Sequence, residues 1–267
     1  MHIVVCVKQI PNPEIAASQF RVDEQAKKVV PLPGTAMVMS PFDEQALEAA
    51  LRLRDNGMAA RITVMTLGPE GARATLKHGL AMGADDAVLI ADAGLDSGNG
   101  YTTARVLTSA IRKLGEPGLI LSGRQAADWD AGVVGCGIAE MLDLPVITFA
   151  RSVEVKDGIV RVERVVENGF DVVEAPLPAV VTVSNELGKP RTPSLRETMR
   201  ASRKPVTAWT AADIGIDAAQ LAQDRARRTL ERLFIPIEDA RCEFIAGDTP
   251  RAQAENLVQR MREARVL

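Results

Sequence analysis

Short apolar runs alternate with segments of helical periodicity through the first 150 residues of this 267-residue chain. The apolar runs are 2–9, 61–67, 86–91, 119–122 and 145–150, and the segments with helical spacing are 40–55, 70–82, 102–114 and 131–142. Strands separated by single helices pair in parallel through right-handed crossovers. Strands that are apolar on both faces belong to a sheet covered by helices on both sides. The alternation therefore predicts a doubly wound parallel sheet of the α/β class.

The pattern changes after residue 150. Short stretches within 151–176 have the composition of antiparallel strands, and Asp157-Gly158 between two of them is a strong hairpin signal. A buried strand returns at 177–183, before the chain becomes polar, basic and proline-containing. The final part, 206–267, has short helices, loops and too few apolar residues for a core of its own. We expect it to form an extended C-terminal tail that packs on another subunit.

Composition excludes several classes of function. The net charge is −3 and aromatic residues make up 3% of the chain, so neither charge nor base stacking favours nucleic acid. No apolar run reaches the roughly 18 residues of a membrane helix, and the N-terminus lacks the pattern of a signal peptide. The cysteines Cys6, Cys136 and Cys242 are far apart and fit no disulfide or metal pattern. We expect a cytoplasmic protein without stable membrane insertion.

A glycine-rich segment at 122–135 follows the apolar run that ends at residue 122. Asp130 is placed to cap a helix, and Gly132, Val133 and Val134 would then offer free N–H groups in its first turn. Such a helix start binds anions, and ligands of parallel sheets lie beyond the carboxyl ends of strands. A second loop of this kind is 66–71. The alternative is an ordinary strand-to-helix turn, because neither a Walker loop nor a full GxGxxG spacing is present.

Candidates for ordinary catalysis are few. The two histidines are His2, at the terminus, and His78, inside a predicted helix. Neither a metalloprotease motif nor a nucleophile elbow is present. Asp128 and Asp130 could form a carboxylate pair, but loop hydrogen bonds explain them more simply. We predict no catalytic residue and no metal site.

Several segments together resemble the β subunit of electron transfer flavoproteins. They are VVCVKQIP, SPFDEQALEAALRLRD, TLGPEGARATLKHGLAMGADDAVLI, GRQAADWDAGVVG, LPAVVTVSNELGKPR and PSLRETMRASRKPV, in order from the start to about residue 206. Each segment is modest evidence, but the ordered series with almost no gaps is specific. The resemblance implies an adenine nucleotide α hydrolase-like, three-layer α/β/α fold over 1–184. It also implies a partner α subunit that carries the redox FAD.

In that family the β subunit binds AMP structurally, or a second FAD in electron-bifurcating members. The resemblance implies nucleotide contacts at Cys6, Ser40, Pro41, Phe42, Asp43, Leu67, Gly123, Arg124, Gln125, Ala126, Asp128, Asp130, Ala131, Gly132, Val133 and Val134. AMP-binding members usually read QAIDDDxNQTG and bifurcating members tend to read QAIDGDTAQVG, whereas this chain reads QAADWDAGVVG. Phosphate contacts must then come mainly from backbone N–H groups, or the ligand differs. Trp129 could cover an adenine or flavin face, or fill a gap at a subunit contact.

The family places a partner-recognition loop at the segment equivalent to 185–205. Leu195 falls on the leucine that docks into flavoprotein dehydrogenases, with Met199 one turn further on and Arg191 among six basic residues of the segment. The alternative is that Leu195 packs onto its own domain. The resemblance favours docking, since a small apolar anchor ringed by positive charge suits a transient interface.

Three hypotheses follow. The first is an electron carrier subunit that binds AMP and passes electrons to the FAD of an α subunit. The second is an electron-bifurcating subunit with a second FAD. The third is a free nucleotide-binding regulatory domain. The first hypothesis divides the chain into an α/β domain at 1–184, a recognition loop at 185–205 and an arm at 206–267 that packs on the α subunit.

Overall fold

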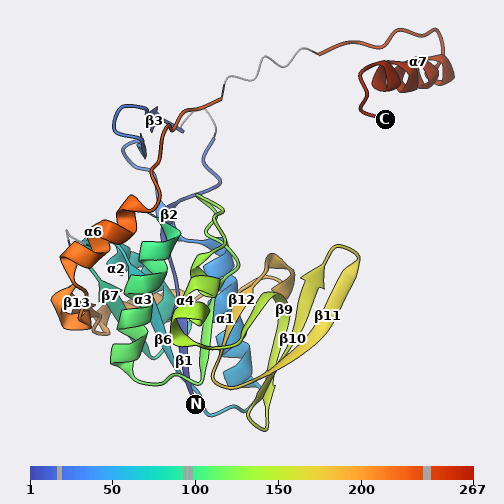
Figure 1. The fold of residues 1–267 in the computed structure, drawn as a ribbon. Coiled ribbons are helices and arrows are strands. Elements are labelled where there is room, and N and C mark those ends of the chain that lie inside the picture. Colours follow the sequence, from blue (N-terminus) through green and yellow to red (C-terminus); the bar gives the residue numbers. More distant parts are fainter. Residues whose placement is uncertain (17–19, 93–94, 96–98, 237–241) are drawn as a thin grey trace.

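The computed structural model of the chain describes residues 1–16, 20–92, 95, 99–236 and 242–267, with helices on both faces of a central sheet (Figure 1). In this described part the main sheet has nine strands, in the order β11-β10-β9-β12-β8-β1-β6-β7-β13. All neighbours from β9 to β13 in that order are parallel, and β10 pairs antiparallel with β9 and β11. The predicted α/β class with a mostly parallel sheet and a small antiparallel region is confirmed.

The strands are β1 (His2–Cys6), β2 (Gln9–Pro11), β3 (Val22–Asp23), β4 (Lys28–Val29), β5 (Met37–Met39), β6 (Arg61–Leu67), β7 (Asp86–Ile90), β8 (Leu119–Gly123), β9 (Val146–Lys156), β10 (Ile159–Val166), β11 (Gly169–Pro176), β12 (Ala179–Val183) and β13 (Thr207–Trp209). The α-helices are α1 (Pro41–Asp55), α2 (Arg73–Met82), α3 (Gly100–Leu114), α4 (Val134–Leu142), α5 (Leu195–Arg203), α6 (Ala218–Ala226) and α7 (Pro250–Glu263). Short 3₁₀ turns lie at η2 (Glu70–Ala72), η4 (Asn185–Leu187) and η5 (Ala212–Ile214).

Alternate residues of the central strand β1 face two separate cores. Ile3 and Val5 pack on one face of the sheet, in the cluster that includes the buried sides of α1 and α2. Val4 and Cys6 point to the other face, in the cluster that includes α3 and α4. Successive side chains of a strand point to opposite faces, so an unbroken apolar run is what a sheet covered on both sides requires. The apolar run at the start of the chain therefore correctly indicated that helices cover both faces of the sheet.

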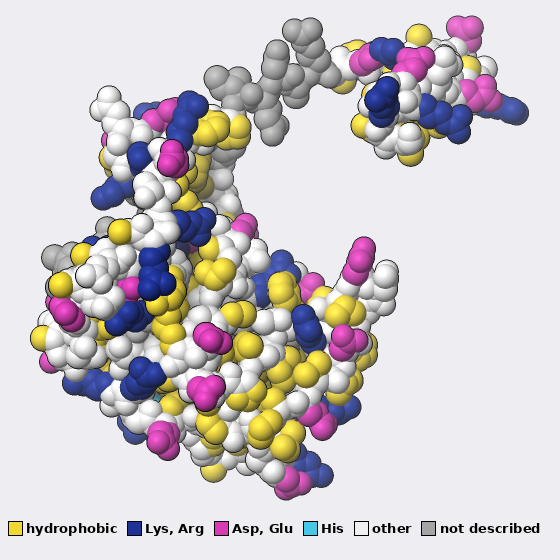
Figure 2. All heavy atoms as spheres, in the orientation of Figure 1, with side chains coloured by type: hydrophobic (Ala, Val, Ile, Leu, Met, Phe, Trp, Pro, Cys, Tyr) yellow, Lys and Arg dark blue, Asp and Glu magenta, His cyan; other side chains and the backbone are white. Residues whose placement is uncertain are grey.

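The antiparallel hairpin continues the main sheet rather than forming a separate one. The first residues of β9 pair in parallel with β12, and the later residues pair with β10. The turn between β9 and β10 is Asp157-Gly158, with φ of 52° and 78° at its two residues. Both values suit the tight hairpin turn that this dipeptide predicts. Figure 2 shows hydrophobic side chains over the visible face of this hairpin.

The segment after residue 205 has two parts. Its first part lies on the α/β domain, because β13 pairs with β7 at the sheet edge and the buried Asp224 of α6 binds Arg105 of α3 at 2.7 Å. Helix α7 lies apart from that domain in Figure 1 and buries none of its residues. Residues 237–241 of the predicted arm lie outside the described residues. No helix in the described part of the chain combines the length and hydrophobicity that crossing a bilayer requires.

Candidate functional site

The carboxyl ends of the central strands meet at one edge of the sheet. Cys6, the last residue of β1, lies opposite Met65 of β6 and Ser122 of β8. Cys6 is buried beneath this edge, and burial raises the pKa of its thiol to about 12. The thiol therefore stays protonated at neutral pH and forms part of the apolar floor. The loops that leave β1, β6 and β8 and the first turn of α1 surround this floor, which is where ligands of parallel sheets bind.

Asp43 joins three of these elements. It lies in the first turn of α1, its Oδ1 accepts the N–H of Gly123 at 2.9 Å, and its Oδ2 accepts the N–H of Lys8 at 2.8 Å. Burial raises the pKa of Asp43 to about 7, although both N–H groups favour the charged form. Asp43 thus connects the loops after β1 and β8 through its own carboxyl group. The buried side chain of Asp43 thereby fixes these two loops relative to α1.

Gly123 permits the close approach of β8 to α1. A Cβ at this position would lie 2.6 Å from Asp43 Oδ1 and 2.6 Å from Phe42 Cβ. Both distances are shorter than atoms in contact allow, so a larger residue would push the loop away from the helix. Gly137 has a similar packing role, since a Cβ there would lie 2.8 Å from Ala104 Cβ of α3.

Arg124 is held between two aromatic rings. Its guanidinium carbon lies 4.8 Å from the ring centre of Phe42 and 5.6 Å from that of Phe149, and Nη1 donates to Ser184 Oγ at 3.2 Å. Cation–π contacts of this kind are favourable and fix the plane of the guanidinium. Arg124 therefore connects α1 with β9 and with the residue that follows β12. Phe149 and Ser184 belong to the structure of this region, although the sequence pattern did not single them out.

The loop after Arg124 is ordered by side chains of its own and by Lys8. Lys8 Nζ forms an ion pair with Asp128 at 2.7 Å, and Gln125 Nε2 donates to Asp130 Oδ1 at 2.8 Å. The hydroxyl of Ser40 does not cap α1 but accepts the N–H of Ala127 at 3.4 Å. Lys8 belongs to the quoted segment VVCVKQIP but was not a predicted contact, because its partner is distant in sequence.

The predicted start of the helix after this loop was wrong. Helix α4 begins at Val134 rather than near Ala131, and Asp130 does not cap it. Asp130 and Gly132 have φ of 49° and 64°, in the left-handed region that a right-handed helix cannot include. The loop therefore makes one further bend before α4 begins at Val134.

The start of α4 nevertheless offers N–H groups to a ligand. In the described part of the chain, no hydrogen bond from the N–H groups of residues 131–136 is recorded. The first N–H groups of a helix lack intrahelical partners and lie at the positive end of its dipole. N–H groups in this arrangement can bind the oxygens of an anion such as phosphate, which makes residues 131–136 a candidate anion-binding site. Trp129, 52% exposed, and Val133 lie in the same loop and leave the site open to solvent.

The structure brings some of the predicted nucleotide contacts into direct contact with one another and places others only in the same loop or at the same edge of the sheet. Phe42, Asp43, Gly123 and Arg124 contact one another directly. The residues of the loop and helix start follow as one segment, and they are Gln125, Ala126, Asp128, Asp130, Ala131, Gly132, Val133 and Val134. Leu67 ends β6 at the same edge of the sheet, where it pairs with Ile90. Pro41 is the first residue of α1 and has a conformational role there.

The predicted docking residues lie on and before α5, far in the sequence from the loop at 124–133. Ser194 and Glu197 form a capping box at the start of the helix. Leu195 is 78% exposed and Met199 is 56% exposed, so neither packs into its own domain. Arg191 forms ion pairs with Glu48 and Asp55 of α1, both at 2.7 Å.

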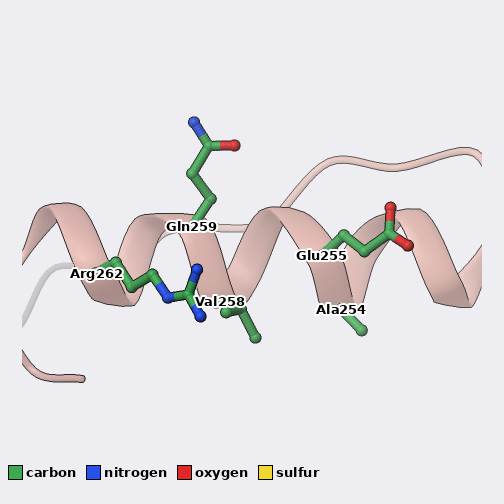
Figure 3. Close-up of a pocket in the computed structure, with 5 residues that line it drawn as sticks. All are labelled: Ala254, Glu255, Val258, Gln259 and Arg262. Atoms are coloured by element: carbon green, nitrogen blue, oxygen red, sulfur yellow. The ribbon is translucent and has the colours of Figure 1, made fainter.

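A hollow on α7 does not offer a better site. The one drawn in Figure 3 is lined by Ala254, Glu255, Val258, Gln259 and Arg262, which all belong to α7. A single helix cannot enclose a ligand, so this hollow is an uncovered helix face. Among the residues that the structure describes, no group of three or more His, Cys, Asp or Glu side chains is arranged for a metal.

Comparisons with known proteins agree on one family. Residues 33–214 match the model of the electron transfer flavoprotein domain. The chain is 37% identical to an electron transfer flavoprotein subunit β of Megasphaera elsdenii, over 88% of each chain. It is 33% identical to subunit CarD of a caffeyl-CoA reductase-Etf complex from Acetobacterium woodii, over the full length of both chains. It is also 33% identical to protein FixA of Azorhizobium caulinodans, over 97% of this chain and 92% of the relative.

Proposed function

The chain belongs to the electron transfer flavoprotein family, among its β subunits, and we propose that it is the β subunit of a heterodimer that binds AMP and docks flavoprotein dehydrogenases. Electrons then pass to FAD held by the α subunit. The observation that supports nucleotide binding is that, in the described part of the chain, the N–H groups of residues 131–136 donate no hydrogen bond. They lie at the carboxyl edge of the parallel sheet. The phosphate binds to these groups and the positive end of the α4 dipole.

The chain itself supplies positioning rather than bond-making. Asp43, Gly123 and Lys8 fix the loops around the nucleotide. Phe42 lies beside Arg124, and we infer that its ring lies near the flavin of the α subunit in the heterodimer. AMP takes no part in electron transfer and stabilises the site, because a ligand that binds only the folded protein raises its stability.

A second FAD in place of AMP is the alternative. It is favoured by the exposed indole of Trp129, which offers a flat surface for an isoalloxazine ring. The loop sequence does not favour it, because the pattern of bifurcating members is absent. Hydride transfer from NADH and electron bifurcation would accompany this second flavin.

The uncovered helix α7 supports pairing with an α subunit. Leu257 and Val258 are exposed on α7, and none of its residues is buried by the rest of the described chain. An amphipathic helix gains most of its stability from covering its apolar side. We infer that α7 and the segment before it pack on the α subunit, which gives the tail its role and argues against a free regulatory domain.

Nucleotide analysis of the heterodimer tests the proposal. The chain is co-expressed with an α subunit encoded beside it, purified, denatured in acid, and its released nucleotides are quantified by chromatography. One FAD and one AMP per heterodimer is the expected result, and two FAD would establish the alternative. A soluble monomer that binds AMP but never pairs with a flavoprotein would overturn the proposal in favour of a regulatory domain.

A further inference from the structure

The helix that carries Leu195 is held by very little apolar packing. Helix α5 is nine residues long, and of these Ala201 alone is buried. Isolated helices of this length are marginal in water, and most helical stability in proteins comes from packing of an apolar face. The side of α5 that carries Leu195 and Met199 is exposed instead. Contacts other than hydrophobic burial must therefore fix the direction in which Leu195 points.

On the N-terminal side, the carboxylate of Glu48 holds the segment. The Glu48 side chain is 6% exposed and accepts Arg191 Nε at 2.7 Å and Arg191 Nη2 at 3.3 Å. The backbone N–H of Arg191 donates to the same carboxylate at 3.2 Å. A bidentate guanidinium together with a backbone donor fixes both the side chain and the main chain at this point. The loop is thereby attached to the middle of α1.

Arg52 extends this attachment. It binds Glu48 through Nε at 2.9 Å, and its Nη1 donates to the carbonyl of Leu187 at 2.9 Å. A third contact runs from Nη2 to the carbonyl of Lys189 at 3.4 Å. Burial alone would raise the pKa of Glu48, but the hydrogen bonds from Arg191 and Arg52 outweigh it and lower the pKa. Glu48 is therefore charged at neutral pH and orients both arginines.

On the C-terminal side, Lys77 of α2 binds the end of α5. Its Nζ donates to the carbonyls of Ala201 at 3.3 Å and Ser202 at 2.8 Å, and also to that of Lys204. A cation at the carbonyl end of a helix is favourable. In return, Lys204 Nζ donates to the carbonyl of Ala84 at 2.9 Å. The exposed turn with Leu195 thus lies between two polar attachments to the rigid part of the domain.

We propose that Glu48 is a positioning residue for partner docking: through Arg191 and Arg52 it holds residues 187–203 in the orientation that presents Leu195. This rests on the proposed docking function. Arg191 acts through Glu48 within the chain, and the cations that meet a dehydrogenase are those exposed on α5, Arg196, Arg200 and Arg203. Pre-ordering a recognition segment reduces the entropy lost on binding, so the attachment raises affinity without touching the partner.

The test compares Glu48→Gln, Arg191→Lys and a matched control, Glu44→Gln, in the intact heterodimer. Glu44 lies on the same helix but pairs with His78 of α2. Hydrogen exchange of the amides in 187–203 is measured by mass spectrometry on the heterodimer in the absence of a dehydrogenase. Loss of a buried charge partner is expected to speed this exchange about tenfold in Glu48→Gln, and less in Arg191→Lys, which keeps the charge but loses the bidentate geometry. The control is expected to match the wild type.

A second readout uses a purified flavoprotein dehydrogenase that reduces the wild-type heterodimer. Glu48→Gln is expected to raise the KM for that dehydrogenase about tenfold with kcat unchanged, because only binding is affected. FAD and nucleotide contents stay at wild-type levels. Unchanged exchange in both Glu48→Gln and Arg191→Lys overturns the positioning role. If exchange rises but Leu195→Ala leaves KM unaltered, the docking function fails while the attachment of the segment stands.

Discussion

The N–H of Gly123 donates to the carboxylate of Asp43 across 2.9 Å, which ties the end of β8 to the first turn of α1. The two residues are 80 positions apart in the chain. Their contact brings the candidate phosphate-binding loop and the SPFD turn to one edge of the sheet. The other oxygen of Asp43 holds Lys8, whose amine reaches Asp128. One buried carboxyl group thus organises most of the candidate site.

Asp43 should impose a pH dependence on stability. Its pKa is raised from 3.8 to about 7, mainly by burial. Between these values the folded protein keeps a proton that the unfolded chain has released, so the free energy of unfolding falls as pH rises from about 4 to 7. The slope from this group is up to about 1.4 kcal/mol per pH unit. Urea unfolding gives the free energy of unfolding of the wild type and of Asp43→Asn at each pH in this range. Parallel plots of this free energy against pH for the two proteins would contradict the prediction.

Gly123→Ala should weaken both the fold and the site. The added methyl group would lie 2.6 Å from Asp43 Oδ1 and from Phe42 Cβ, so β8 and α1 must separate. Overpacking of this kind costs about 1–3 kcal/mol. The midpoint temperature of thermal unfolding and the nucleotide content after gel filtration should both decrease. Gly71→Ala is the control, because a Cβ there would lie 3.8 Å from Gln9 Oε1, an ordinary contact. An equal decrease of unfolding temperature and nucleotide content in both variants would contradict the prediction.

Leu195→Ala should slow electron delivery from a dehydrogenase. The side chain is the most exposed leucine on the described part of the chain and supplies the apolar anchor of the proposed interface. We expect about a tenfold rise in the KM for the dehydrogenase, with FAD content and heterodimer assembly unchanged. Val166→Ala, an exposed apolar residue at the far end of the hairpin, should behave like wild type. Unchanged steady-state transfer by Leu195→Ala would count against docking.

Trp129 should report on nucleotide binding. In a Trp209→Phe background Trp129 is the remaining tryptophan, since the chain has two. Its indole is half exposed in the structure, so stacking on an adenine or flavin ring would reduce its contact with water. We expect its fluorescence to shift to shorter wavelength or be quenched when the nucleotide is bound, relative to protein stripped of nucleotide. An identical spectrum in both states would favour a role at the subunit contact instead.

Much of the fold followed from local pattern. The strand at 61–67 and the helix ending at residue 142 were predicted with the bounds that the structure has for those ends. Such elements are long or strongly periodic, and their apolar faces are buried where the pattern places them. The hairpin also followed, because Asp157 and Gly158 adopt the positive φ that a tight turn needs.

What the sequence missed depends on long-range geometry. β13 is three residues long and owes its existence to pairing with β7, which a local pattern does not reveal. The ion pair of Lys8 with Asp128 spans 120 positions. The start of α4 was misplaced because a left-handed bend at Asp130 cannot be distinguished from a helix cap by residue type. The ion pair of Arg191 with Glu48 was also not foreseen, because the two residues are 143 positions apart.

The place of β12 in the sheet has a consequence for synthesis on the ribosome. This strand lies between β8 and β9, although both of those precede it in the chain. Until residues 179–183 have left the exit tunnel, the edges of β8 and β9 that face β12 in the folded protein have no strand to pair with. The β9–β10 hairpin therefore cannot join the parallel part of the sheet. The nascent chain should therefore remain sensitive to protease until the ribosome has moved well past residue 183, and then become resistant in a single step.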